Sequence, residues 1–409
     1  MEAVFSDVCG LDVHAGSVQA CVRHLRAGRV EHEVRGFGTM TRDLLLLADW
    51  LKAEAVTHVA MESTGVYWKP IFNLLEGQFE VLVVNARHVK HVPGRKTDVL
   101  DCQWLAQLLQ CGLLRGSFVP ERPQRELRDL TRHRAQLVHQ LAAVANRIQK
   151  VLEDANIKLG QVASDVLGVS GRARLRALVE GGQTPEQMAE LARKQLRKKL
   201  PELRLALDGR LTAHHRFVLA ELLDQVDDLE RRIERFSRRI EEISGPFAAA
   251  ISAVAELPGF NQRSAENVVA EIGADMSRFP TADHLASWAG LCPGSHESAG
   301  KRKSGKTTKG SRWLRAALCQ AAWAATRTKK SYFRAQYGRL VRRRGKKRAI
   351  VAVGHSLLRV IYHVLSTGEV YADLGVDFFE KRETDRLVQS HVRRLESLGY
   401  QVTLAKPAA

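Results

Sequence analysis

The first part of the chain carries short apolar runs of the kind that form strands. Three such runs lie within residues 4–37, and the turn-prone sequences HAG and RAG separate them. Residues 41–54 show helical spacing, and two apolar, β-rich runs at 57–64 and 79–86 then flank a further helical segment. A last helical pattern follows. We therefore predict a mixed α/β sheet domain over residues 1–118.

The middle of the chain, residues 119–249, has the pattern of long helices. Apolar residues recur at steps of three and four from Leu137 to Val151, and a longer repeat of the same kind runs from Leu219 to Ile243. Charged residues fill the positions between them. Heptads of this length predict a coiled coil, formed within one chain or between chains. The Gly-Pro pair that follows is expected to end the second helix.

Charge separates the rest of the chain into a mostly helical domain over residues 250–368 and a tail over 369–409. The whole chain has a net charge of +18, yet the stretch 298–368 alone holds 19 Lys or Arg and no acidic residue. A protein surface normally mixes charges of both signs. This stretch therefore predicts a polyanionic partner, and nucleic acid is the obvious one.

Other features of the composition exclude several classes of protein. No run approaches the ~18 apolar residues of a membrane span, and the first residues lack the regions of a signal peptide. Six cysteines are scattered singly without a CxxC pair, which argues against a zinc site or a disulfide framework. We expect a cytoplasmic protein without a membrane partner.

Four acidic residues stand out by their positions. Asp12 lies inside an apolar strand (CGLDVH), and Glu62 lies at the end of another (HVAMESTG). Asp98 and Asp101 open the last helical segment (KTDVLDCQWLA). An acid in a buried strand is costly unless it is paired or binds a metal. For the two helix aspartates alone, capping is the simpler interpretation, with Thr97 as the N-cap.

These acids can converge only if a sheet brings their segments together. An RNase H-like (RuvC-like) sheet does so, because adjacent central strands supply two acids and a helix across the sheet supplies the others. Four carboxylates suit Mg²⁺, with Mn²⁺ as the alternative, as a pair of ions about 4 Å apart of the kind that cleaves phosphodiesters. The predicted metal ligands and catalytic acids are Asp12, Glu62, Asp98 and Asp101.

The sequence motifs around these acids resemble those of one protein family. GLDVH, MESTGVYW and GRKTDVLDCQWLA are similar to the DEDD domain of the IS one-ten family of insertion-sequence transposases, relatives of the Piv DNA invertases. ELPGFNQRSAENVV and AGLCPGSHESAGKRKSGKTTKGSRWLR resemble the C-terminal domain of that family, the first as a helix-hairpin-helix-like element. The resemblance spans residues 7–365 in the family's order. It implies a bacterial, DNA-associated recombinase.

The family's catalytic serine falls on Ser298 when the motifs AGLxP, SxGKR and KGxxxLR are matched. The chemistry of the surrounding residues gives weaker support for Ser298 as the nucleophile. A serine between small residues can approach a phosphodiester closely, and seven Lys or Arg between 301 and 315 could stabilise developing charge. Ser304 is the alternative nucleophile. The activating base is left open, since neither His296 nor Glu297 is distinguished.

Candidate nucleic-acid contacts follow from charge and from one turn. The turn is Pro258-Gly259, whose backbone N–H groups could meet a phosphate. The basic run at 341–348 and HVKH at 88–91 are expected to contact nucleic acid without reading sequence, whereas Tyr67 and Trp68 are expected to pack on the sheet. The predicted contacts are Arg95, Lys96, Gly259, Lys301, Arg302, Lys303, Lys306, Lys309, Arg312 and Arg315.

The resemblance also implies the partners. Donor and target DNA would be exchanged through a covalent serine–DNA intermediate and a Holliday-junction-like stage, guided by a bridge RNA. Homo-oligomers, dimers or tetramers, would complete the DEDD site of one protomer with the serine of another. Two other hypotheses stay open. One is a metal-dependent Holliday-junction-type nuclease in which water attacks, and the other is a non-catalytic DNA-binding coiled-coil protein.

Overall fold

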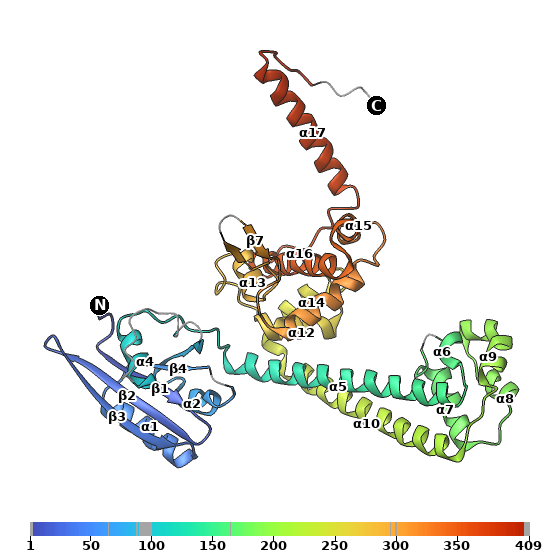
Figure 1. The fold of residues 1–409 in the computed structure, drawn as a ribbon, viewed down its shortest axis with the longest axis horizontal. Coiled ribbons are helices and arrows are strands. Elements are labelled where there is room, and N and C mark those ends of the chain that lie inside the picture. Colours follow the sequence, from blue (N-terminus) through green and yellow to red (C-terminus); the bar gives the residue numbers. More distant parts are fainter. Residues whose placement is uncertain are drawn as a thin grey trace. The chain divides into compact units, whose positions relative to one another are not determined.

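A computed structural model describes residues 3–63, 65–86, 89, 100–163, 165–294, 296–298 and 301–404. The chain divides into two compact units, Met1–Pro120 and Glu121–Ala409 (Figure 1).

The first unit is built on a mixed sheet. Its elements are β1 (Asp7–Val13), β2 (Ser17–Arg26), β3 (Arg29–Gly38), α1 (Thr41–Ala53), β4 (His58–Glu62), α2 (Trp68–Leu75), β5 (Glu80–Val84) and α4 (Asp101–Gln110). Among the described residues the sheet has five strands in the order β3-β2-β1-β4-β5. β2 runs antiparallel to both of its neighbours, whereas β1, β4 and β5 are parallel. The predicted mixed α/β sheet is confirmed.

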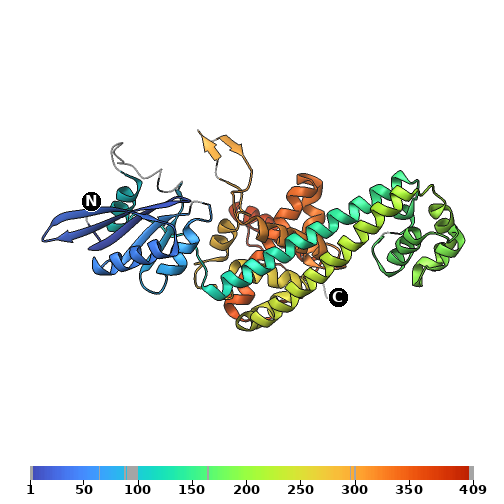
Figure 2. The ribbon, with the colours of Figure 1, turned by 90° about the horizontal axis from the view of Figure 1, so that it is seen from below.

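Strand residues alternate between two faces, and helices cover both (Figure 2). Cys9 and Leu11 of β1 pack with α1 and α2, whereas Val8 of the same strand packs with α4. α4 lies so close to β1 that a Cβ on Gly10 would be 2.2 Å from the carbonyl oxygen of Cys102. Gly10 therefore allows α4 to sit directly on the sheet.

The start of α4 differs from the sequence prediction. The helix begins at Asp101 and not at Asp98, and its N-cap is Leu100, so the prediction of Thr97 as the N-cap is wrong. The physical reason is local. The side-chain oxygen of Gln103 accepts the backbone N–H of Leu100 at 3.2 Å and satisfies a donor at the helix start.

The aromatic pair before α2 divides between the core and the surface. Trp68 packs against the sheet core, as predicted. Tyr67 is 47% exposed, so the prediction that it packs on the sheet is wrong. Tyr67 precedes the first turn of α2, whose apolar face is formed by Ile71, Phe72 and Leu75 instead.

The second unit starts with two long helices that lie side by side, α5 (Arg122–Asp154) and α10 (Ala213–Ile243) (Figures 1 and 2). Their buried residues share one core, which includes Val144 of α5 and Val226 of α10. The predicted long helices are confirmed and pair within the chain, while coiled-coil geometry stays a prediction. α10 ends directly before the Gly-Pro pair, as predicted.

Short helices connect α5 to α10 and complete that core. They are α6 (Leu159–Val162), α7 (Val169–Glu180), α8 (Pro185–Glu190), η1 (Lys194–Lys199) and α9 (Leu200–Leu207). Their apolar residues pack with the C-terminal half of α5 and the N-terminal half of α10.

The remainder of the unit is a helical domain with one small hairpin. Its elements are η2 (Gly245–Phe247), α11 (Ala248–Ala255), α12 (Gln262–Ile272), α13 (Ala282–Trp288), β6 (His296–Ser298), β7 (Lys301–Ser304), α14 (Arg312–Ala325), α15 (Tyr332–Arg344), α16 (Lys346–Thr367) and α17 (Phe378–Ser397). Residues of α11 to α14 and α16 share one apolar core. α11 and α12 contact each other across the Pro-Gly turn between them.

One helix of the described residues, α16, has the length and apolar composition of a membrane span. The sequence expectation that no run approaches such a span is therefore wrong. Packing explains the composition, because Val353, Leu357 and Leu358 are fully buried in the core of the helical domain.

Candidate active site and nucleic-acid surface

Two predicted metal ligands lie near the carboxyl ends of the neighbouring parallel strands β1 and β4. The last paired residues of β1 and β4 are Leu11 and Met61, and Asp12 and Glu62 are the next residues along. Neighbouring strands lie about 4.8 Å apart, so the two acids leave the sheet from adjacent positions. Ala60, two residues before Glu62, packs with α4, so alternation puts both acids on the α4 face.

Asp101 reaches the same region from α4, as its first residue. Burial raises the pKa of the Cys102 thiol, and the carboxylates of Asp12 and Asp101 raise it further. Both carboxylates therefore lie within electrostatic range of one thiol. The Asp12 side chain is 26% exposed, and its Oδ2 lies 3.2 Å from Nε2 of His14. Strand register and helix packing thus bring three of the four predicted acids to one face.

A metal ion at this face stays a prediction. In the part of the chain that the structure describes, no group of three or more His, Cys, Asp or Glu side chains could hold a metal ion. Asp98, Arg95 and Lys96 lie outside that part, as does most of the HVKH segment at 88–91.

Ser298 lies at the end of the short strand β6, which the sequence analysis did not predict. β6 and β7 form an antiparallel hairpin in which Ser298 pairs with Lys301, and His296 pairs with Ser304. This hairpin has no signal in the sequence, because HES and KRKS contain none of the apolar alternation by which strands are recognised. The proposed nucleophile thus stands opposite a cationic residue at the closed end of the hairpin.

The segment that carries the hairpin is fixed to α14. The guanidinium of Arg315 donates hydrogen bonds to the carbonyl oxygens of Gly290 and Thr308, the second at 2.9 Å. Gly290 has a φ of +68°, and a Cβ there would lie 2.6 Å from the backbone nitrogen of Gly310. Arg315 therefore has a structural role here, and its predicted contact with nucleic acid stays a prediction.

Of the other predicted nucleic-acid contacts, Gly259 is packed against a helix and four cations are exposed. Gly259 has a φ of +89° and lies against α14, where a Cβ would be 2.2 Å from the carbonyl oxygen of Ala321. The turn therefore needs glycine for packing, whatever it contacts. The side chains of Arg302 and Lys303 lie outside those described. The exposed cations are Lys301, Lys306, Lys309 and Arg312.

Sequence reasoning missed a buried ion-pair network between α5 and α12. Arg134 donates to Glu266 at 2.6 Å, and Arg132 donates to both carboxylate oxygens of Glu271 at 2.7 and 2.9 Å. Burial lowers the pKa of the adjacent Arg128 to about 10. A signal was present, because both glutamates lie within the otherwise apolar run AENVVAEIG. Buried acids in such a run need a cationic partner.

Two family models match the chain, one in its N-terminal part and one in its C-terminal half. Residues 9–157 match a DEDD model of the IS110 (IS one-ten) group, described as a transposase. Residues 251–338 match the model described as transposase IS116/IS110/IS902 family. The two matches together cover more than half of the chain.

Individual relatives agree. The chain is 27% identical over 321 residues to a "Probable family 20 transposase" of Pseudomonas aeruginosa, and the match covers 76% of this chain and 85% of that protein. It is 24% identical over 304 residues to the "Transposase for insertion sequence element IS1111A" of Coxiella burnetii, across 71% of this chain and 72% of that protein. The chain is thus an insertion-sequence transposase, an enzyme that cuts and joins DNA. It belongs to the IS110 family.

Proposed function

We propose that this transposase cuts and rejoins DNA strands through a covalent bond between Ser298 and a DNA phosphate. The observation that supports the proposal best is that Asp12, Glu62 and Asp101, which come from three separate segments, lie on the same face of the sheet. Acids in adjacent strands and a third on the helix that crosses them also support an RNase H-like interpretation of this sheet.

The proposed step conserves the number of phosphodiester bonds. The hydroxyl oxygen of Ser298 forms a bond to phosphorus, and the bond from phosphorus to one deoxyribose oxygen breaks. The hydroxyl loses its proton, and the leaving oxygen gains one. Because one ester replaces another, the reverse step can rejoin a different strand without an external energy source.

The cations of the hairpin would stabilise the charge that develops on the phosphate. Lys301 stands opposite Ser298 in the register, and Lys306 is exposed in the segment that follows. The carboxylates of Asp12, Glu62, Asp98 and Asp101 would hold Mg²⁺ or Mn²⁺, which when bound supplies a Lewis acid to phosphate oxygens. Three of these four acids share one face, and this agrees with such a ligand set.

We further propose a guide RNA and an oligomer with shared active sites. The acid-free stretch 298–368 supports a polyanionic partner, since its 19 Lys or Arg exceed the net charge of the whole chain. A discrete RNA of one size that copurifies with the protein would support the guide, and purification without RNA would count against it.

Strand cleavage by two matched serine variants tests the serine. Ser298→Ala should abolish Mg²⁺-dependent cleavage of cognate DNA, whereas Ser304→Ala, in the same hairpin, should retain it. Asp101→Asn should also abolish cleavage. If Ser298→Ala cleaves as fast as the parent, water is the nucleophile and the alternative metal-dependent nuclease is correct.

Mixing two inactive variants tests the composite site. Ser298→Ala and Asp101→Asn protomers, combined before DNA is added, should regain part of the cleavage activity, because some sites then join an intact serine to intact acids. No recovery at any ratio would mean that each protomer supplies a whole site.

A further inference from the structure

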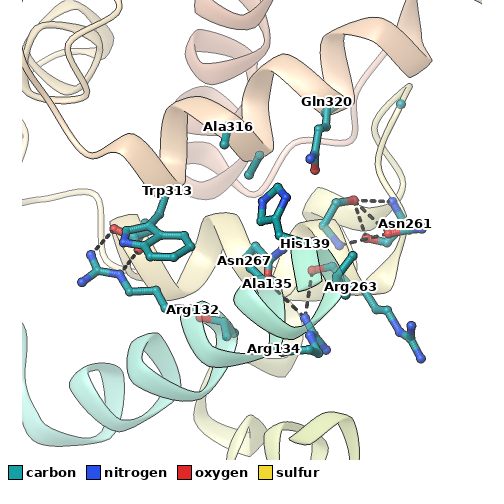
Figure 3. Close-up of a pocket in the computed structure, with 17 residues that line it drawn as sticks. Arg132, Arg134, Ala135, His139, Asn261, Arg263, Asn267, Trp313, Ala316 and Gln320 are labelled. Atoms are coloured by element: carbon teal, nitrogen blue, oxygen red, sulfur yellow. Dashed lines mark hydrogen bonds and ion pairs between the residues drawn. The ribbon is translucent and has the colours of Figure 1, made fainter. Parts of the chain in front are cut away.

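A pocket outside the proposed catalytic residues lies where α5, α12 and α14 meet, all within the second unit (Figure 3). Its volume is about 350 Å³, within the range of small-ligand pockets. Its apolar wall comes from small residues of two helices, among them Ala135 on α5 and Ala316 on α14. The proposed function assigns no role to this pocket.

The polar side chains of the pocket include an indole, an imidazole and amides, and the arginines Arg132 and Arg134 are already paired with glutamates. Trp313, His139 and Gln320 are turned toward the same space (Figure 3). Arg134 donates to Oδ1 of Asn267 at 3.1 Å, which fixes the orientation of that amide in the pocket wall. The ligand would therefore meet one indole face and amide groups that can both donate and accept.

Glu271 lines the pocket, and its carboxylate does not attract a cationic ligand because it is already paired. Glu271 accepts hydrogen bonds from Arg132 and from the hydroxyl of Ser311, the latter at 2.9 Å. Glu266 lies against Arg134 and is buried. With these acids paired, the positive charge at the pocket comes from two exposed cations, Arg263 in its lining and Arg312 beside Trp313. A ligand with a flat neutral body and flanking negative charge fits both features.

We propose that this pocket binds one unpaired nucleobase of a nucleic-acid strand, stacked on Trp313, with its flanking phosphates on Arg263 and Arg312. Stacking on an aromatic side chain suits any base, since every base has a π-face. The guanidinium of Arg312 lies 5.0 Å from the centroid of the Trp313 ring and so can extend the stack while it faces a phosphate. The inference rests on the proposed function only in that a strand with an unpaired base must reach the protein.

Binding of short strands in EDTA tests the pocket apart from catalysis. The full chain with Ser298→Ala is titrated against fluorescein-labelled dT₈ and against an abasic strand with the same number of phosphates. The measured quantity is the affinity for dT₈ divided by the affinity for the abasic strand. We expect Trp313→Ala to lower this ratio by about five- to 150-fold, the effect of losing one base–aromatic stack.

Trp323→Ala is the matched control. Trp323 lies on the same helix, is 43% exposed, and packs on Tyr337 with ring centroids 5.7 Å apart, outside the pocket. It should leave the ratio unchanged. Two milder variants keep the test valid if Trp313→Ala misfolds. Trp313→Phe should retain part of the ratio, and Gln320→Ala, at an exposed position, should lower it.

The same titration with rU₈ and its abasic ribose counterpart identifies the source of the base. A ratio that falls in Trp313→Ala only for deoxyribose strands assigns the base to DNA, and only for ribose strands to RNA. If neither ratio changes in Trp313→Ala, Trp313→Phe or Gln320→Ala, the proposal is overturned. Loss of cleavage in Ser298→Ala is unaffected by this outcome, so the two failures are distinguishable.

Discussion

At the scale of single residues, the close packing of α4 on the sheet depends on Gly10, which has no Cβ. A Cβ at position 10 would lie 2.2 Å from Cys102 O and 2.5 Å from Ala106 N, both backbone atoms of α4. Backbone cannot move aside as the end of a flexible side chain can. Asp101 starts the same helix, so the position of one candidate catalytic acid depends on Gly10.

Gly10→Ala should therefore lower both stability and cleavage. Overpacking of this kind costs about 1–3 kcal/mol, and displacement of α4 would move Asp101 away from Asp12. Thermal unfolding and DNA cleavage measure the two effects. Gly16→Ala is the control, because a Cβ at Gly16 meets no atom within 4 Å. Equal melting temperatures for the two variants would contradict this role of Gly10.

His355 on α16 gives the helical domain a predictable response to acid. Burial lowers the pKa of His355 below its ordinary value of 6.5; Arg359 lowers it further and Asp283 opposes the shift. Below about pH 6.5 the unfolded chain binds a proton that the folded chain binds only at lower pH. Stability should therefore fall as the pH drops from 6.5 through the folded pKa.

His355→Gln should reduce that fall. Thermal unfolding at intervals between pH 7 and pH 5 gives the slope for the parent and the variant, and the difference between the slopes isolates this residue from other titrating groups. Parallel curves would show that His355 titrates alike in both states.

At the scale of elements, α5 and α12 are joined by buried ion pairs beside a small apolar cluster that contains Leu127 and Ala270. The side chains of Arg134 and Glu266 are both less than 10% exposed, and Arg134 also donates to the carbonyl oxygen of Arg263. Such a pair fixes register, because a shifted helix would leave two buried charges alone. It also shapes one wall of the pocket that contains Trp313.

Arg134→Met should destabilise the chain by about 3–5 kcal/mol, because Glu266 is left buried and unpaired. The double variant Arg134→Met with Glu266→Leu should recover most of that loss. Urea unfolding of the single and double variants gives both numbers. Arg122→Ala, which removes an exposed pair with Glu126, should cost no more than about 0.5 kcal/mol. A double variant as unstable as the single one would show that the loss does not come from the unpaired charge.

Sequence reasoning could predict what depends on local pattern. Short apolar runs between turn-prone residues identified the strands, and the steps from Leu219 to Ile243 identified α10. It could place Asp12 inside one strand and Glu62 at the end of another, since that requires only strand boundaries. It missed the β6–β7 hairpin, whose residues are polar on both faces, and the Arg134–Glu266 pair, whose partners are 132 positions apart. The glutamates left a signal in their apolar surroundings, but a partner that lies so far along the chain cannot be identified from local pattern.

At the scale of the whole molecule, positive charge is concentrated in one stretch of the chain. The segment 298–368 contains 19 Lys or Arg without a single acid, and it includes β7, α14, α15 and α16. Cations that neutralise phosphates release counterions, so binding through this stretch must depend steeply on salt.

Replacing two of these cations should flatten the salt dependence of DNA binding. Lys301→Gln with Lys306→Gln should reduce the slope of log K against log salt by up to about 0.9 for each phosphate that is no longer neutralised. Lys150→Gln with Lys198→Gln removes the same charge from exposed positions outside the stretch and should leave the slope unchanged. Equal slopes for the two double variants would mean that only net charge matters.

A covalent serine–DNA intermediate is the core of the proposed mechanism, and a denaturing gel with labelled DNA tests it most directly. With DNA radiolabelled on either side of the cleavage site, we predict label that stays on the protein through denaturation in the parent and in Ser304→Ala. Proteolysis should place that label on the peptide that contains Ser298, and Ser298→Ala should carry none. Label that persists on Ser298→Ala protein, or cleavage by this variant at the parental rate, would rule out Ser298 as the nucleophile.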